Sequence, residues 1–304
     1  MNNKTTKVIV TGGAGFIGSN LSEALLLKGF EVHIIDNLSG GKKENIPEGA
    51  IFHEKDIRNL ADIRDIFSDT KYVFHLAALP RVQYSIEHPD ETHDVNITGT
   101  LNVLLASKDA GVSKVVYSAS SSAYGDQPIL PLIEGMRESP KSPYALHKFA
   151  SELYCRMFSE VYGLPTVSLR YFNVYGPKMD PFGAYALAVG LFLRLRKEGK
   201  PITITGDGMQ TRDMTHVRDV IHANILAAES ETVKNGEVMN IGSGKNYTIN
   251  HLAELIGGPV EHIAPRFEPH DTLADISLAK KLLGWEPKEN FEEGIAELKK
   301  EFGL

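Results

Sequence analysis

The stretch TGGAGFIG at residues 11–18 decides the fold. It follows the apolar run Val8–Val10 and opens a helical pattern that extends from Phe16 to Lys28. Read from Gly13, its spacing is G-x-G-x-x-G, in which glycines let the backbone turn tightly and approach a pyrophosphate. The N-terminus of the following helix directs free N–H groups at that phosphate. Strand, turn and helix together favour a dinucleotide site over an ordinary glycine-rich turn.

Short apolar runs alternate with longer helical patterns over the first half of the chain. We expect strands at residues 8–11, 31–35, 72–76, 114–118 and 166–171, and helices at residues 16–28, 60–67, 90–110 and 144–162. Strands that alternate with helices are typical of βαβ units. The sequence therefore predicts an α/β fold, a Rossmann-type doubly wound parallel sheet.

An acidic residue closes the second expected strand. Asp36 stands there, 18 positions after Gly18, and Asn37 follows it. A carboxylate at this place accepts hydrogen bonds from an adenosine ribose and repels a 2′-phosphate, which favours NAD over NADP. The alternative is a turn-forming aspartate after a strand. Asp56, directly after a third strand pattern, is expected beside the adenine.

The alternation of strands and helices breaks after Tyr171, where Pro177, Pro181 and Gly183 mark irregular structure. We predict an NAD-binding Rossmann domain over residues 1–172, to which residues 212–242 return. A smaller mixed α/β substrate-binding lobe is predicted over residues 173–211 and 243–304.

Tyr144 and Lys148 form a Y-x-x-x-K pattern on an expected helix, so both side chains share one face. A free tyrosine, with a pKa of about 10, is a poor base at neutral pH. An ammonium one turn away and a nicotinamide cation would both favour the phenolate. A solvated helix face explains most chance occurrences of this pattern. It gains weight from SASSSAYG at residues 118–125, because carboxyl ends of parallel strands hold ligands.

Composition excludes several other classes. The formal charge is −7, from 39 acidic and 32 basic side chains, so no nucleic-acid partner is expected. Cys155 is the single cysteine and cannot form an internal disulfide; we expect no metal site. The longest apolar run, residues 184–193, is too short to span a bilayer. No signal pattern precedes the first strand, so we expect a cytoplasmic protein with no membrane partner.

Six stretches resemble, in order, landmarks of the extended short-chain dehydrogenase/reductase family: TGGAGFIG, DNLSGG, SASSSAYG, SPYALHK, RYFNVYGP and GDGMQTRDMTHVRD. The closest likeness is to UDP-glucose and UDP-N-acetylglucosamine 4-epimerases, over residues 7 to about 285. This resemblance implies NAD-dependent 4-epimerisation of a UDP-sugar through a transient 4-keto intermediate. It also implies a homodimer.

The resemblance assigns a role to each matching residue. The catalytic set it implies is Ser120, Tyr144 and Lys148. Cofactor contacts would come, together with Tyr144 and Lys148, from Gly12, Gly15, Phe16, Ile17, Asp36, Asn37, Ser39, Gly40, Asp56, Ile57, Leu76, Ala77 and Ala78. Substrate contacts would come from Ser120, Ser122, Asn173, Arg212, Arg266 and Thr272.

Two parts of the sequence discriminate within the family: the serine loop, residues 118–125, and residue 272. Related dehydratases and decarboxylases carry an acidic residue after the catalytic hydroxyl, whereas Ser121 and Ser122 stand here, which favours epimerisation. Thr272 matches a size gate at which glucose-restricted members have tyrosine, so UDP-GlcNAc and UDP-GalNAc are expected beside UDP-Glc and UDP-Gal. Alternatively, the shortened segment at residues 266–271 moves Thr272 away from the sugar. The loop at residues 79–82 also departs from the glucose-type pattern.

Two other functions stay open. One is a UDP-glucuronate-type 4-epimerase, which has the same chemistry on a different sugar. The other is a non-catalytic NAD(H)-sensing protein on the same fold, although such proteins usually lack the tyrosine–lysine pair.

Overall fold

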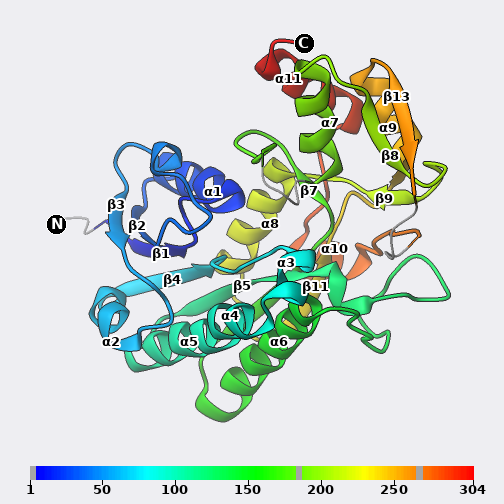
Figure 1. Cartoon of the computed structure of the whole chain (residues 1–304). Coiled ribbons are helices and arrows are strands. Elements are labelled where there is room, and N and C mark those ends of the chain that lie inside the picture. The colour runs from blue at the N-terminus through cyan, green and yellow to red at the C-terminus, as the bar shows by residue number, and fades with distance from the viewer. Residues whose placement is uncertain (1–4, 183–186, 265–269) are drawn as a thin grey trace.

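The structure is a computed structural model that describes residues 5–182, 187–264 and 270–304. Its centre is a seven-stranded sheet with the order β11-β6-β5-β4-β1-β2-β3 (Figure 1). Every pair of neighbouring strands in this sheet is parallel. The predicted Rossmann-type α/β fold is confirmed.

The strands of the central sheet are short and mostly buried. Their bounds are β1 Lys7–Thr11, β2 Glu31–Asp36, β3 Ile51–Glu54, β4 Thr70–His75, β5 Lys114–Ser120, β6 Thr166–Tyr171 and β11 Asn235–Ile241. All six residues of β6 are buried, since helices cover both faces of the sheet. β5 extends two residues beyond the expected end, because Ala119 and Ser120 still pair with Arg170 and Tyr171.

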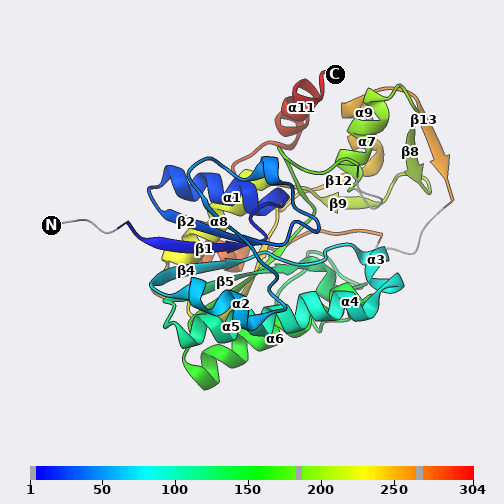
Figure 2. The same cartoon turned by 60° about the vertical axis from the view of Figure 1, so that its left-hand side comes forward.

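Helices cover the two faces of the sheet (Figure 2). One face carries α1 Phe16–Leu27, α8 Val217–Glu229 and α10 Ser277–Leu283; the other carries α2 Leu60–Ile63, α5 Gly99–Asp109 and α6 Pro143–Tyr162. The helix expected at residues 90–110 is interrupted: α4 Pro89–His93 leads through a π-helical turn, Asp94–Thr98, into α5. Short helices join these elements: η1 Lys43–Asn45, η2 Arg64–Phe67, α3 Val82–Glu87 and η4 Ser121–Tyr124.

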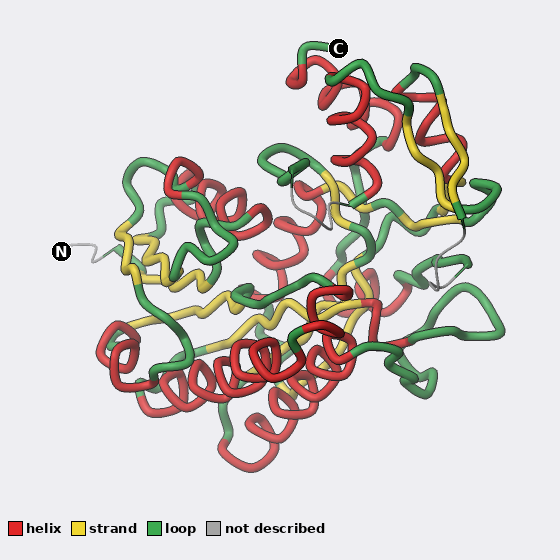
Figure 3. The backbone as a smooth tube through the Cα atoms, viewed as in Figure 1, coloured by secondary structure: helices red, strands yellow, loops and turns green. Residues whose placement is uncertain are grey.

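A smaller unit lies at the upper right of Figure 1, and Figure 3 shows it as helices flanking short strands. Its elements are β7 Val174–Tyr175, α7 Ala188–Lys197, β8 Ile202–Thr205, β9 Thr211–Asp213, β10 Thr215–His216, β12 Asn246–Thr248, α9 Ile249–Ile256, β13 Val260–Ile263 and α11 Phe291–Phe302. The strands form three pairs, β10–β7, β12–β9 and β13–β8. Apolar side chains of α7, α9 and α11 form its core.

The chain crosses between the two units more than once. β11 lies beside β6 in the central sheet, after the chain has passed through β8 and β9. Ala279 of α10 and Trp285 pack into the core of the central sheet, although the sequence boundaries assign them to the lobe. The domain boundaries themselves stay a prediction. Within the described residues, none of the helices has the length and apolar character needed to cross a membrane.

Candidate active site

The loop after β1 forms a cradle in which Gly12 and Gly18 leave no room for a side chain. A Cβ on Gly12, whose φ is +73°, would lie 2.7 Å from the backbone nitrogen of Ala77. A Cβ on Gly18 would lie 2.1 Å from the carbonyl oxygen of Gly12. Gly15 is the N-cap of α1 and offers no side-chain cap to the first N–H groups of the helix. Such a helix start, approached closely by backbone, suits the pyrophosphate of a dinucleotide.

A buried histidine ties the loops after β1 and β4 together. Thr11 Oγ1 accepts a hydrogen bond from Ala77 N–H at 3.2 Å and lies 2.7 Å from Nδ1 of His75. On its other side, His75 Nε2 lies 2.9 Å from Thr100 Oγ1, which donates to the carbonyl oxygen of Asn96. Burial lowers the pKa of His75 to about 3, so the ring is neutral at physiological pH.

The Asn96 amide holds the loop at residues 79–82. Its Oδ1 accepts from Leu79 N–H at 2.8 Å, and its Nδ2 donates to the Leu79 carbonyl oxygen at 3.1 Å. Asn96 lies in the π-helical turn before α5 and is buried. The irregular turn therefore supplies a side chain that fixes the loop beside the cofactor site.

The carboxylate of Asp36 organises the backbone at the end of β2. One oxygen accepts from Ala14 N–H at 3.0 Å and the other accepts from Leu38 N–H at 2.8 Å. Burial raises the pKa of Asp36, and these two N–H groups oppose the rise. A negative charge thus lies beside the glycine loop, where an adenosine ribose would bind in this fold.

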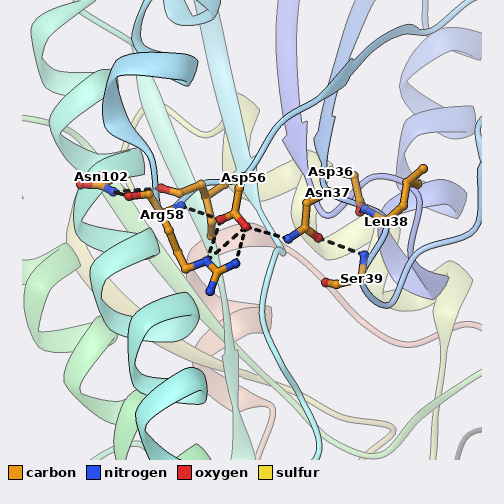
Figure 4. Close-up of polar contacts among 8 residues, drawn as sticks. Asp36, Asn37, Leu38, Ser39, Asp56, Arg58 and Asn102 are labelled. Carbon is orange, nitrogen blue, oxygen red and sulfur yellow. Dashed lines mark hydrogen bonds and ion pairs between the residues drawn. The ribbon is translucent and has the colours of Figure 1, made fainter.

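Figure 4 shows a polar chain that joins the ends of β2 and β3. Asn37 Nδ2 donates to Asp56 at 2.9 Å, and Asn37 Oδ1 accepts from Ser39 N–H at 3.0 Å. Arg58 donates to both oxygens of Asp56, at distances of 2.7 to 3.1 Å. The Arg58 guanidinium is the main reason that the pKa of Asp56 falls to about 2. The bonds fix both loops as one rim of the expected adenosine site.

Ser120 and Tyr144 meet at the end of β5. Ser120 Oγ accepts from Ser122 N–H at 3.2 Å and from Ser122 Oγ at 2.8 Å, so its own proton is available to Tyr144. Burial raises the pKa of the Tyr144 phenol, and a hydrogen bond from Ser120 opposes the rise. The arrangement brings two of the three predicted catalytic groups close together.

Two serine hydroxyls fix the start of the helix that bears Tyr144. Ser142 is the N-cap of α6 and accepts from Ala145 N–H at 3.2 Å. Ser85, on α3, accepts from Tyr144 N–H at 3.1 Å and donates to the Val82 carbonyl oxygen. The first helical turn, which places the phenol, is therefore bonded to a neighbouring helix as well as capped.

Lys148 lies one turn further along α6 and is buried. Its ammonium donates to the Ser118 carbonyl oxygen at 2.7 Å and lies 5.0 Å from the centre of the Tyr117 ring. Burial lowers the pKa of Lys148 to about 8. The backbone of β5 thus orients the ammonium close to the predicted serine–tyrosine pair.

The structure also places the predicted substrate residues that it describes. Asn173 Nδ2 donates to the Asp213 carbonyl oxygen at 3.0 Å and to Thr272 Oγ1 at 3.3 Å, so Asn173 and Thr272 are in contact. Arg212 donates to the carbonyl oxygens of Thr211 and His270, each at 2.9 Å. Arg266 lies outside the described residues.

Several supporting side chains were not predicted from the sequence, among them Arg58, Ser85 and Asn96. Arg58 had a local signal, since an arginine two residues after Asp56 can fold back onto that carboxylate. Ser85 and Asn96 act through contacts 59 and 17 residues away along the chain, which no local pattern reveals. Among the described residues, no group of three histidine, cysteine or acidic side chains could hold a metal ion.

Comparison with known proteins gives consistent results. The model of the NAD dependent epimerase/dehydratase family matches residues 8–242. A putative UDP-glucose 4-epimerase of Methanocaldococcus jannaschii is 38% identical over 298 residues, covering 95% of each chain. A UDP-glucuronate 4-epimerase of Thermodesulfobacterium geofontis is 38% identical over 312 residues, covering 94% of this chain and 93% of the relative.

Solved structures agree with these relatives. A UDP-N-acetylglucosamine 4-epimerase from Methanobrevibacter ruminantium, in complex with UDP-N-acetylmuramic acid, superposes with a TM-score of 0.93 at 40% identity and 98% coverage of both chains. A UDP-glucose 4-epimerase from Thermus thermophilus, in complex with NAD, gives a TM-score of 0.91 at 35% identity, covering 98% of this chain and 99% of the other.

Proposed function

Because this chain belongs to the NAD-dependent epimerase/dehydratase family and its cofactor is NAD, we propose that it is a UDP-sugar 4-epimerase. One observation carries the proposal. The Ser120 hydroxyl lies close enough to the Tyr144 phenol to lower its pKa, while the two positions after Ser120 hold serines and not a carboxylate. Such a site can move a proton at the sugar 4-hydroxyl, but it has no acid in the serine loop to expel water from a keto intermediate.

The proposed chemistry uses few protein groups. NAD⁺, when bound, would supply the acceptor for the hydride of sugar C4 and, once reduced, its donor. Tyr144 takes the proton of the 4-hydroxyl, with Ser120 bridging the two oxygens, and Lys148 stabilises the phenolate. The resulting 4-keto sugar then rotates in the pocket while Asn173 and Arg212 hold its diphosphate. Tyr144 then returns the proton as the opposite C4 configuration forms.

The proposed cofactor contacts follow the cradle and its rim. The backbone of the glycine loop and the start of α1 would hold the pyrophosphate, because nothing larger than glycine fits at Gly12 and Gly18. The rim formed by Asp36, Asn37 and Asp56 would hold the adenosine. The residues proposed to line the rest of the site are Gly15, Phe16, Ile17, Ser39, Gly40, Ile57, Leu76, Ala77 and Ala78.

We propose that the sugar pocket accepts UDP-GlcNAc and UDP-GalNAc as well as UDP-Glc and UDP-Gal. The contact between Thr272 and Asn173 supports this, because it places a small residue beside a proposed diphosphate ligand. The backbone of Thr272 also bonds to Thr211 of β9, at 3.1 Å, despite the shortened segment before it. A phenol ring at this position would occupy space that an N-acetyl group needs.

Thr272→Tyr is expected to lower kcat/KM for UDP-GlcNAc relative to UDP-Glc by about tenfold or more, because overfilling a packed site typically costs about 1–3 kcal/mol. Thr272→Val is the matched control, since it removes the hydroxyl without adding length, and the ratio should stay near that of the wild type. Both ratios come from coupled assays on a panel of UDP-sugars. An unchanged ratio in the tyrosine variant rules Thr272 out as the gate.

The same panel decides between the proposed function and its alternatives. The relative from Thermodesulfobacterium geofontis keeps UDP-glucuronate 4-epimerisation as the second candidate. Turnover of UDP-glucuronate alone would establish that candidate. If protein that contains NAD turns over none of these UDP-sugars, the result would favour the non-catalytic NAD(H)-sensing alternative.

We further propose a homodimer that packs through α6. Along this helix Leu146, Leu153 and Val161 are 53%, 46% and 65% exposed, an apolar stripe that a second copy could cover. Analytical ultracentrifugation at micromolar concentration is expected to show a dimer, and a monomer there would contradict the proposal. The cytoplasmic location expected from the sequence stays a prediction.

A further inference from the structure

A buried ion pair joins α6, the helix that bears Tyr144 and Lys148, to the neighbouring strand β6. Arg170 of β6 and Glu152 of α6 are 1% and 2% exposed. The Arg170 guanidinium donates to Glu152 through Nε at 3.0 Å and through Nη2 at 2.7 Å. A buried pair of this kind costs desolvation energy and is weak evidence for stability, so its presence next to an active site calls for another explanation.

The guanidinium of Arg170 joins three separate parts of the site. Besides Glu152 it binds Glu138, in the loop before α6, at 2.7 Å. It also lies 4.5 Å from the centre of the Tyr124 ring, at the end of the serine loop. Arg170 therefore lies between α6, the loop that precedes α6, and the serine loop.

Glu152 follows Lys148 by four residues on α6, so the two side chains lie on the same face of consecutive turns. A buried ammonium needs a compensating negative charge close by. The titratable groups around Lys148 are Tyr144, Glu152 and Cys155 on its own helix, Tyr117 on β5 and His75 on β4.

Before NAD⁺ binds, only one of these groups is an anion near neutral pH. Burial raises the pKa of Cys155 to about 12 and raises the pKa values of Tyr117 and Tyr144, so all three are protonated before NAD⁺ binds. The proposed Tyr144 phenolate forms only once the nicotinamide cation lies beside it. His75 is neutral. Burial also raises the pKa of Glu152, but the guanidinium opposes the rise, and two hydrogen bonds from Arg170 fit an ionised carboxylate.

We propose that Glu152 is a positioning residue, whose carboxylate is kept ionised by Arg170 and in turn keeps the buried Lys148 ammonium charged beside Tyr144. The inference rests on the proposed role of Lys148 in the epimerisation. Arg170 has a second carboxylate partner, Glu138, which lies on a loop and is 22% exposed. Glu138 therefore offers a matched control: it contacts the same guanidinium but does not share the helix face with Lys148.

The test compares Glu152→Gln with Glu138→Gln in the full-length protein with bound NAD. Titration of the ¹³Cε signal of Lys148, assigned with Lys148→Met, reports the ammonium directly. In Glu152→Gln its midpoint is expected to fall by about one pH unit, because the facing negative charge is lost. The pH at which kcat declines on the alkaline side of its profile should fall by a similar amount. In Glu138→Gln the midpoint should stay within about 0.3 pH unit of the wild type.

An unchanged Lys148 midpoint in Glu152→Gln, or an equal shift in Glu138→Gln, would overturn the proposal. If Glu152→Gln does not fold, the double variant Glu152→Gln/Arg170→Met takes its place, because it leaves no guanidinium without its main partner. The Lys148 midpoint of this variant is expected to fall in the same direction by a smaller amount. No fall of that midpoint would also overturn the proposal. The titration needs no substrate. If the wild type turns over no UDP-sugar, the proposed function is refuted. The Lys148 midpoints would still test this inference.

Discussion

Tyr144→Phe is expected to lower kcat by at least about 100-fold while NAD stays bound, since general acid–base groups typically contribute about 10²–10⁴-fold. The phenol lies close to the Ser120 hydroxyl, and its removal leaves that hydroxyl without a base. The backbone of residue 144 still bonds to Ser85, so the start of α6 should keep its place. Steady-state kinetics with the best substrate of the panel gives the result.

Tyr154→Phe is the matched control for this variant. Tyr154 lies further along the same helix and packs against the apolar core, so the kcat of its phenylalanine variant should stay close to that of the wild type. If Tyr144→Phe keeps more than about a tenth of the wild-type kcat, a loss below about 1.4 kcal/mol, Tyr144 is not the base.

Protein stripped of its cofactor is expected to bind NAD at least about 100-fold more tightly than NADP. The buried carboxylate of Asp36 would face the 2′-phosphate, and two charges 4 Å apart near a protein surface repel by about 4 kcal/mol. Isothermal titration with both nucleotides measures the ratio.

Asp36→Asn sharpens this measurement. The amide keeps an oxygen acceptor for one of the two N–H groups, from Ala14 and Leu38, that bind Asp36, but it removes the charge. The preference for NAD should shrink mainly through tighter NADP binding. Equal affinities of the wild type for the two nucleotides would contradict the role of Asp36.

The sequence predicted the central sheet well because each strand and helix of it has its own local pattern. The glycine loop, the apolar strands and the amphipathic helices all have short periods that follow from backbone geometry. The π-helical turn was missed, since its hydrogen bonds differ from those of an α-helix without any change in apolar spacing. The extra length of β5 depends on pairing with β6 and so on tertiary contact.

The site could be predicted only in part, for a related reason. Residues such as Tyr144 and Lys148 stand out through spacing on one helix. The groups that hold them come from distant segments: Ser85 bonds to Tyr144 across 59 residues, and Ser118 bonds to Lys148 across 30. A neutral buried histidine and a buried ion pair look, in sequence, like ordinary polar residues.

The position of β11 has a consequence for how such proteins can be recombined. This strand covers the outer edge of β6, whose residues are all buried, yet it is made by chain that comes after the first part of the smaller unit. A fragment that stops at Phe172 would leave β6 as an unpaired edge strand, which invites pairing with other chains. Exchanging sugar specificity between relatives therefore calls for grafting two separate segments around β11, with α8 and β11 left in the recipient.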